Sequence, residues 1–331
     1  MPDSFANKLL QWYDCHGRHD LPWHHNRNAY RVWVSEIMLQ QTQVTTVIPY
    51  FEAFMERFPD VPALAEAPVD DVLSHWSGLG YYARARNLQK AAQTVVREFD
   101  GEFPQTQEEL ESLTGIGRST AAAILAQAFG ICAAILDGNV KRVLARYHAI
   151  PGWPGQTAVL NQLWQRAEEH TPEQRVRDYT QGIMDLGAMV CTRSRPACES
   201  CPLQEGCRAY AQGETSLYPG SKPKKAKPEK STWMVILEDG EGRILLERRP
   251  PSGIWGGLWS LPELDLINGF RHTFSHYHLH IQPARLNVTG GANTVADKDH
   301  LKWLHRHEAL NLGLPAPIRS LLTEPEQAAL L

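Results

Sequence analysis

Four of the six cysteines in this 331-residue chain fall within a segment of 17 residues. Six, two and five residues separate them, and they are Cys191, Cys198, Cys201 and Cys207. Four thiolates packed so closely are typical of a metal site, because such a set holds either tetrahedral zinc or an iron–sulfur cluster. The spacing leaves both metals open. The remaining Cys15 and Cys132 stand alone in the sequence, so we expect them to be packing or surface thiols.

Glu36 is a carboxyl residue inside the apolar run VWVSEIML, residues 32–39. Removing a carboxyl from water raises its pKa, because the charged form loses its solvation. A carboxyl that keeps its proton near neutral pH can act as a general acid. The alternative is a solvated glutamate on a helix surface, or one that caps a helix. The segment therefore marks Glu36 as a candidate acid.

Asp137 is the second candidate carboxyl, in the run LDGNVKR, residues 136–142. Its position predicts the N-cap of a helix that begins near Val140. One protonated and one ionised carboxyl is the general arrangement for glycoside cleavage. The sequence spacing of Glu36 and Asp137 does not establish that the two meet.

The elements that must position Asp137 begin with a predicted helical hairpin over residues 107–129. Thr106 and Glu109 form a capping box, which predicts a helix from about Gln107 to Leu113. A second helix should open near Arg118 and present Ala122, Leu125, Ala126 and Phe129 on one face.

The turn of this hairpin reads Gly115-Ile116-Gly117. Free backbone N–H groups at the start of the second helix, together with the helix dipole, can bind an anion, and glycines let a phosphate approach. Ile116 is apolar, so the turn should grip a nucleic-acid backbone without reading base edges. The alternative is an ordinary helical corner that ends in a glycine cap.

Composition changes twice along the chain. The apolar pattern is helical to about residue 210, so residues 1–217 are predicted to form an all-α domain, with a cysteine loop at 191–207. Residues 218–230 are rich in Pro and Lys and predict an extended linker, either a solvated spacer or a contact to a DNA backbone. Residues 231–331 turn to strand patterns and predict a small α+β domain.

Within the last domain, strands are expected at 233–237 and 243–247, joined by a hairpin turn at 239–242. A further strand is expected over 270–281 and a closing helix over 317–322.

The bulk composition is that of a globular chain, with 43% hydrophobic and 21% charged residues. The net charge of −4 gives no indication of a nucleic-acid partner, so any basic surface must be local. The sequence has no run of transmembrane length and its start lacks the features of a signal peptide, so we expect a cytosolic protein with reduced cysteines.

The hairpin followed by the 136–142 run resembles the helix-hairpin-helix DNA glycosylases, and within them the MutY-type adenine glycosylases. The match extends from about Leu9 to Gly220 and resumes in the last third of the chain. Family members bind a [4Fe–4S] cluster at these cysteine spacings, so the resemblance implies that cofactor here. It also implies an all-α glycosylase domain followed by a Nudix-like domain.

The resemblance assigns roles to single residues. Glu36 would protonate adenine, Asp137 would stabilise positive charge on the sugar, and Asn139 would orient the site. Relatives that also cut the strand carry a lysine at the position of Ser119, so base removal alone is expected. The remaining matches are Gln41, Thr42, Leu79 and Tyr81 at the wedge positions that replace a flipped base, Arg18, Trp23 and Gln181 in the adenine pocket, and Gly115, Gly117 and Lys141 at DNA phosphates.

The C-terminal third resembles the Nudix fold around the run WGGLWSLP, residues 255–262, but it lacks the spaced glutamates of the Nudix catalytic box. Phe274-Ser275-His276 matches the family's loop that senses 8-oxoguanine, so Ser275 and His276 are expected to meet the lesion. Only residues 263–269 stand where the family carries a further helix.

The resemblance therefore implies a monofunctional glycosylase that removes adenine paired with 8-oxoguanine, and also with guanine, from duplex DNA, and we expect a monomer. Two alternatives stay open. A glycosylase/lyase acting on pyrimidine lesions would need lysine in place of Ser119. A non-catalytic mismatch binder would be expected to have lost Glu36 or Asp137.

Overall fold

The computed structural model describes residues 4–223, 227–250, 252–264, 270–275, 277–287 and 301–323. The chain divides into two compact units, one of residues 1–62 with 90–223 and one of residues 63–89 with 224–331. No helix among the described residues is both long and apolar enough to cross a membrane.

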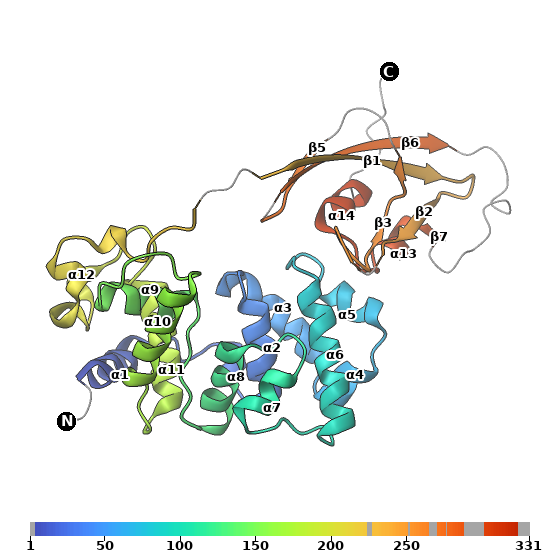
Figure 1. Ribbon diagram of the computed structural model, residues 1–331. Coiled ribbons are helices and arrows are strands. Elements are labelled where there is room, and N and C mark those ends of the chain that lie inside the picture. The colour runs from blue at the N-terminus through green and yellow to red at the C-terminus, as the bar shows by residue number, and fades with distance from the viewer. Residues whose placement is uncertain are drawn as a thin grey trace. The chain divides into compact units, whose positions relative to one another are not determined.

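The first unit is built of helices, shown in blue, green and yellow in Figure 1, which confirms the predicted all-α fold. Its longer elements are α1 (Ser4–His16), α2 (Ala29–Leu39), α3 (Val44–Arg57), α7 (Gln107–Ser112), α8 (Arg118–Ile124), α9 (Gly138–Tyr147), α10 (Thr157–His170) and α11 (Val176–Asp185). Short elements complete it: η1 (Pro22–His24), the π-helices η2 (Leu125–Phe129) and η3 (Leu186–Val190), η4 (Cys198–Ser200), η5 (Gln204–Gly206), α12 (Arg208–Ala211) and η6 (Thr215–Leu217).

Local capping explains where the central helices begin. Thr106 accepts a hydrogen bond from the backbone N–H of Glu109 and donates its hydroxyl to the Glu109 carboxylate, so the two predicted residues cap α7 through the threonine side chain. Asp137 caps α9 by accepting from Val140 N, as predicted. One detail differs: the helix after the hairpin turn continues as a π-helix from Leu125, so Phe129 is rotated away from the expected face and is only half-buried.

One hydrophobic core joins α1, α9, α10 and α11. Its fully buried members include Leu9 of α1, Leu144 of α9, Leu163 of α10 and Ile183 of α11. Leucine and isoleucine side chains buried this completely each contribute about 1.5–3 kcal/mol relative to exposure. This core fixes the two ends of the chain segment that carries Asp137.

The second unit contains α5 (Val69–His75) and a mixed sheet with strand order β3-β2-β1-β6-β5. Helix α4 (Val61–Glu66) and helix α6 (Ala83–Glu98) each cross the boundary between the units. Strands β1 and β6 are parallel neighbours, and β1 pairs with β2 through an antiparallel hairpin (Figure 1). The described elements are β1 (Glu229–Glu238), β2 (Arg243–Arg248), β3 (Trp259–Ser260), β4 (Glu263–Leu264), β5 (Phe270–Thr273), β6 (His278–Asn287), β7 (Leu301–His305), α13 (Arg306–Ala309) and α14 (Ala316–Thr323).

The predicted α+β pattern is confirmed, with two corrections. The run 270–281 is not one strand but the antiparallel hairpin of β5 and β6, because the chain turns back where Phe274 N donates to Tyr277 O. Strand β1 begins at Glu229 rather than at 233, because its pairing with β6 starts there, opposite His278. Within the shortened segment, Glu263 and Leu264 pair with β1, and residues 265–269 lie outside the described part of the chain.

Candidate active site

Glu36 lies in the last two turns of α2, among the buried side chains of Trp33, Ile37 and Met38. Its carboxyl has no hydrogen-bond partner among the described residues, and the residue is half-buried. Burial raises the pKa of Glu36 to about 8, with a smaller contribution from the negative charge of Asp137. This carboxyl therefore keeps its proton at neutral pH, as the apolar sequence around it predicted.

Asp137 lies at the N-terminus of α9. One carboxylate oxygen accepts from Val140 N at 2.8 Å and the other accepts from Asn139 Nδ2 at 3.1 Å. Burial raises the pKa of Asp137, whereas these hydrogen bonds and the nearby Arg142 guanidinium lower it. Because the charge of Asp137 acts on Glu36, the structure brings the two carboxyls and Asn139 into one site.

Arg142 fixes Asn139 from the side away from Asp137. Its Nη2 donates to Asn139 Oδ1 at 2.8 Å and to the Gly187 carbonyl at 2.6 Å, and its Nε donates to the Cys191 carbonyl at 2.7 Å. A Cβ added to Gly187 would lie 2.6 Å from the Asn139 Cβ, so only glycine fits there. The sequence did not indicate this close approach.

Ser119 stands in the first turn of α8 and binds the backbone that leads into Asp137. Its Oγ accepts from Leu136 N at 2.9 Å. Serine at this position therefore supports the residue that precedes the catalytic candidate.

The two positions of the hairpin turn, Gly115 and Gly117, suit glycine for different physical reasons. Gly115 has φ +87°, which only glycine adopts without strain. Gly117 caps α8 with ordinary backbone angles, and a Cβ added there would meet nothing within 4 Å. Ile116 is buried, so the turn presents backbone rather than a side chain. The space above Gly117 is what a closely approaching phosphate needs.

Gln181 belongs to a buried polar network between α11, η1 and η2. Gln181 Nε2 donates to Asp185 Oδ1 at 2.8 Å. The carboxylate of the fully buried Asp185 also accepts hydrogen bonds from Arg18 N and from the Arg18 guanidinium, each at 2.7 Å. Because the amide nitrogen faces a carboxylate, Gln181 Oε1 must be the atom that accepts from Gln127 Nε2 and from His24 Nε2, each at 3.1 Å. Gln127 and His24 were not among the predicted residues. The π-helical twist that turns Gln127 inward leaves no periodic signal in the sequence.

Trp23, Gln41 and Thr42 belong to the first unit. Trp23 is buried and packs edge-on against Phe51, with ring centroids 5.5 Å apart. Gln41 follows the end of α2 and is exposed, with the left-handed φ of +59° that non-glycine residues rarely adopt. Thr42 N donates to Leu39 O at 3.2 Å, which closes the turn.

Leu79 and Tyr81 belong to the second unit, in the turn of residues 78–81, which we call the wedge turn. Tyr81 is 45% exposed and has φ +49°, whereas Leu79 is buried. Gly78 and Gly80 lie on either side of Leu79, with φ of +109° and +71°. Backbone held in sparsely populated regions clusters at functional sites.

Of the remaining predicted contacts, Lys141 and Ser275 lie among the described residues. Lys141 is half-buried in the first turn of α9. Ser275 is exposed at the bend between β5 and β6, and His276 lies outside the described residues.

The four clustered cysteines line one cavity beneath Arg146. Among the described residues, no three His, Cys, Asp or Glu side chains lie close enough to share a single metal ion. Four thiolates around one cavity are a donor set that suits either a zinc ion or an iron–sulfur cluster.

Arg146 organises this cavity and is itself buried. Its Nη1 donates to Cys191 Sγ at 3.3 Å. Its other donors bind carbonyls of the surrounding loops, those of Thr192, Arg193, Thr215 and Tyr218.

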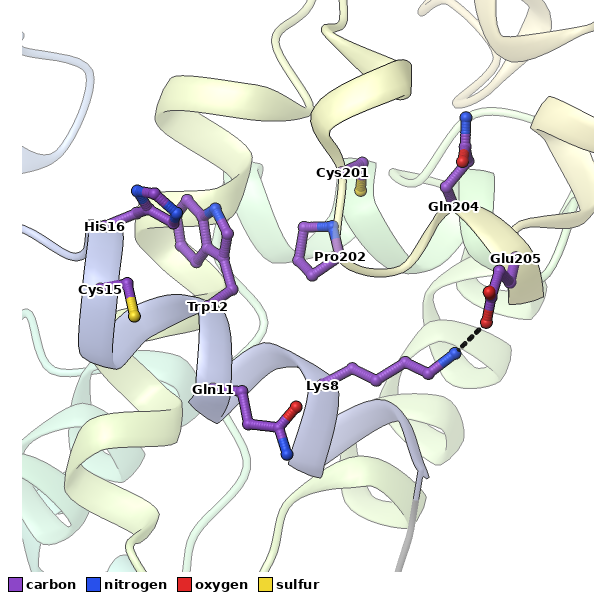
Figure 2. A pocket seen from close by; sticks show the side chains of 9 residues that line it. All are labelled: Lys8, Gln11, Trp12, Cys15, His16, Cys201, Pro202, Gln204 and Glu205. Atoms are coloured by element: carbon purple, nitrogen blue, oxygen red, sulfur yellow. Dashed lines mark hydrogen bonds and ion pairs between the residues drawn. The ribbon is translucent and has the colours of Figure 1, made fainter.

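Helix α1 closes the cysteine loop from outside. A groove of about 430 Å³ lies between them. Figure 2 shows that Lys8 reaches across it to Glu205 and that Trp12 lies opposite Pro202. Cys201 also lines this groove.

Comparison with known proteins agrees with both folds. Residues 34–169 match the HhH-GPD superfamily of base excision DNA repair proteins, and residues 232–324 match the NUDIX domain. A structure of a thermostable thymine-DNA glycosylase is 28% identical with a TM-score of 0.57, covering 63% of this chain and 95% of that one.

Relatives that match nearly the whole chain identify the family more specifically. The adenine DNA glycosylase of Buchnera aphidicola subsp. Schizaphis graminum (strain Sg) is 38% identical over 339 residues, which cover 96% of this chain and 97% of the relative. The adenine DNA glycosylase of Homo sapiens is 39% identical over 387 residues, 92% of this chain and 71% of the relative. The resemblance found in the sequence is thus confirmed, and the chain belongs to the adenine DNA glycosylase family of helix-hairpin-helix base excision repair enzymes.

Proposed function

We propose that this enzyme removes adenine from duplex DNA, and that the base it favours opposite that adenine is 8-oxoguanine. The observation that carries the proposal is the pair of carboxyls in one site, with the pKa of Glu36 raised to about 8 beside an Asp137 that accepts hydrogen bonds on both oxygens. Chemistry that breaks a glycosidic bond needs one acid and one ionised carboxylate.

In the proposed reaction the adenine is first flipped out of the duplex. Glu36 donates its proton to the purine, so the electron pair of the breaking bond between sugar and base leaves with a neutral adenine. The sugar is left with positive charge, which the carboxylate of Asp137 stabilises. Water then adds to the sugar carbon, and its proton goes to the Glu36 carboxylate, which restores the acid. Asn139, held between Asp137 and Arg142, keeps the carboxylate aimed at the sugar.

The adenine pocket is assigned to Arg18, Trp23 and Gln181. The buried network around Asp185 supports this assignment, because it fixes Gln181 in one orientation. A fixed carboxamide distinguishes donors from acceptors on a base edge, whereas a rotating one does not.

The wedge that fills the vacated stack is assigned to Gln41, Thr42, Leu79 and Tyr81. The left-handed backbone of Gln41 and Tyr81 and the exposure of the Tyr81 ring support it. Gly115 and Gly117 would bring the hairpin backbone against a phosphate, and Lys141 would neutralise another.

Base removal without strand cleavage follows from Ser119. A lyase needs an amine at this place to form a Schiff base with the sugar. The Ser119 hydroxyl instead accepts from Leu136 N and so holds the segment that ends in Asp137.

The cofactor is proposed to be a [4Fe–4S] cluster held by Cys191, Cys198, Cys201 and Cys207, with Arg146 against the first thiolate. The bound group would fasten loop 191–207 to α9 and α12. The two arginines of this loop, Arg193 and Arg195, could then meet phosphate. Purified protein should be brown and absorb in the usual iron–sulfur region, whereas a colourless zinc-loaded preparation would overturn this assignment.

Recognition of 8-oxoguanine is assigned to Ser275, exposed at the bend between β5 and β6, and to His276 beside it in sequence. The Ser275 hydroxyl can donate or accept a hydrogen bond, which suits a base edge altered by oxidation.

The decisive assay uses a labelled duplex with adenine opposite 8-oxoguanine, treated with and without alkali after incubation. Strand cleavage is expected only after alkali, because the DNA backbone breaks at an abasic site under alkaline conditions. Cleavage without alkali would favour a lyase, and an intact strand under both conditions would favour a non-catalytic binder. A parallel duplex with adenine opposite guanine measures the preference for the lesion.

A further inference from the structure

The two residues that flank the wedge turn share one hydrogen-bond acceptor in the C-terminal part of the chain. Ser77 Oγ donates to the Leu314 carbonyl at 2.9 Å and Tyr82 OH donates to the same oxygen at 3.1 Å. All three residues belong to the second compact unit. Leu314 belongs to the short segment 312–314 between α13 and α14, which we call the strap.

Tyr82 is also bonded to the wedge turn itself. Its hydroxyl accepts from Gly78 N at 3.5 Å while it donates to Leu314 O. The Tyr82 side chain is buried. A single hydroxyl thus connects the first amide of the wedge turn to the strap.

The strap is fixed to the sheet and fits tightly against α5. Gly313 O accepts from Trp259 N of β3 at 3.2 Å. A Cβ added to Gly313 would lie 2.7 Å from the Leu73 Cβ, so the backbone of the strap packs directly on α5. Arg319 of α14 binds both sides, donating to Ser77 Oγ and to Leu312 O at 3.2 Å each.

Three further hydrogen bonds hold the same surfaces together. Asp70 of α5 accepts from Arg248 at 2.9 Å and from Trp259 Nε1 at 3.3 Å. Arg86 of α6 donates to the Gly256 carbonyl. The sheet is therefore attached to α5 and α6 on both sides of the wedge turn. A displacement of the sheet would consequently shift the positions of Ser77 and Tyr82.

The turn responds to such a displacement because its conformation is imposed from outside. Trp76 Nε1 donates to Gly80 O at 3.1 Å, and Arg84 donates to the carbonyls of Leu79 and Gly80 at 3.2 Å each. Strained backbone of this kind persists only while its surroundings determine it.

We propose that Ser77 and Tyr82 are positioning residues that couple the C-terminal domain, to which recognition of 8-oxoguanine is assigned, to the wedge turn. Contact of that domain with the base opposite adenine changes the position of the strap, and the two hydroxyls transmit this change to the turn that carries Tyr81. The proposal rests on the proposed function, in which Tyr81 enters the duplex and the C-terminal domain meets 8-oxoguanine.

The test compares Tyr82→Phe and Ser77→Ala with Tyr30→Phe in the full-length protein. Tyr30 is a matched control, because it too is buried and donates its hydroxyl to a backbone carbonyl, that of Phe58, at 2.7 Å. Single-turnover rates of adenine release are measured opposite 8-oxoguanine and opposite guanine. Tyr82→Phe should lower the ratio of these rates about five-fold, the effect of one lost hydrogen bond, while Tyr30→Phe should leave the ratio unchanged.

A purely structural role would lower both rates together, as any loss of stability does, and an unchanged ratio in Tyr82→Phe would overturn the proposal. The proposed function can fail separately. If the unmodified protein releases no adenine, hydrogen exchange of segment 77–82 decides instead. A duplex with 8-oxoguanine opposite adenine should slow exchange there more than one with guanine, and Tyr82→Phe should abolish that difference. An equal response to both duplexes would refute the coupling.

Discussion

Glu36 lies in the last turns of α2 and Asp137 lies at the first turn of α9, and the two regions surround the same functional group differently. The helix around Glu36 carries the buried residues Trp33, Ile37 and Met38, and no described residue donates to the Glu36 carboxyl. Around Asp137 the free N–H groups of a helix start and the Asn139 amide face the carboxylate. Both groups are withdrawn from water, but only one of them receives hydrogen bonds in return.

The difference shows that burial alone does not set the protonation of a carboxyl. Burial raises the pKa of both groups. At Asp137 the hydrogen bonds and the Arg142 charge act against burial, whereas at Glu36 the negative charge of Asp137 adds to it. A negative charge on Asp137 therefore helps to keep Glu36 protonated, so the region around α9 contributes to the acid character of the region around α2.

The largest expected effect comes from removing the acid. Glu36→Gln keeps the size and polarity of the side chain but cannot transfer a proton, so adenine release should fall by about 10²–10⁴-fold. Binding to the duplex should persist, because the protonated Glu36 is neutral and its replacement by glutamine changes no charge. Single-turnover kinetics and a gel-shift assay measure the two properties. The exposed Glu52 of α3 offers the control Glu52→Gln, and full turnover in Glu36→Gln would remove Glu36 from its role.

Asp137 should be next in size. Asp137→Asn keeps an oxygen for Val140 N and so keeps the helix cap, but it removes the negative charge under the sugar. We expect a fall in rate of about 10²-fold with little change in melting temperature. Asp137→Ala separates the two functions, since it should also cost about 1 kcal/mol of stability through the lost cap. A drop in stability for the asparagine variant as large as for the alanine variant would mean that capping is the whole role.

The pH dependence tests the comparison directly. The acid must be protonated, so the rate should fall above pH 8, about ten-fold per pH unit, as Glu36 ionises. Asp137 must be ionised, so the rate should also fall at low pH. The midpoint of this fall should lie above the ordinary pKa of an aspartate, because burial raises the pKa of Asp137. A profile that stays flat from neutrality to pH 10 would contradict the assigned acid.

The parts of this site that follow local rules were predictable. An apolar run around Glu36 indicates desolvation, and an aspartate before a Gly-Asn-Val run indicates a cap, so the environment of each carboxyl could be inferred from its own neighbours. Their meeting could not, because 100 residues separate them and only the packing of helices brings them together.

The supporting residues escaped prediction for a different reason. Gln127 points inward because the helix after Ile124 widens into a π-helix, and no propensity marks that change. Gly187 must be glycine because Asn139 approaches it from another helix. The left-handed backbone of Gln41 and Tyr81 is likewise imposed by tertiary contacts against local preference.

The smallest effect concerns the support of Asp137 rather than the carboxylate itself. Ser119→Ala removes the acceptor of Leu136 N, the amide of the residue directly before Asp137. An unsatisfied buried amide costs about 1–3 kcal/mol, and the freed backbone should let the carboxylate drift and lower the rate several-fold. Ser112→Ala is the matched control, because Ser112 bonds the Glu109 carbonyl in the preceding helix and does not contact the 136–137 segment. Thermal unfolding and single-turnover rates should separate the two variants. Equal rates in both would show that α9 alone holds Asp137 in place, so that the ionised half of the pair depends on its cap and not on the hairpin.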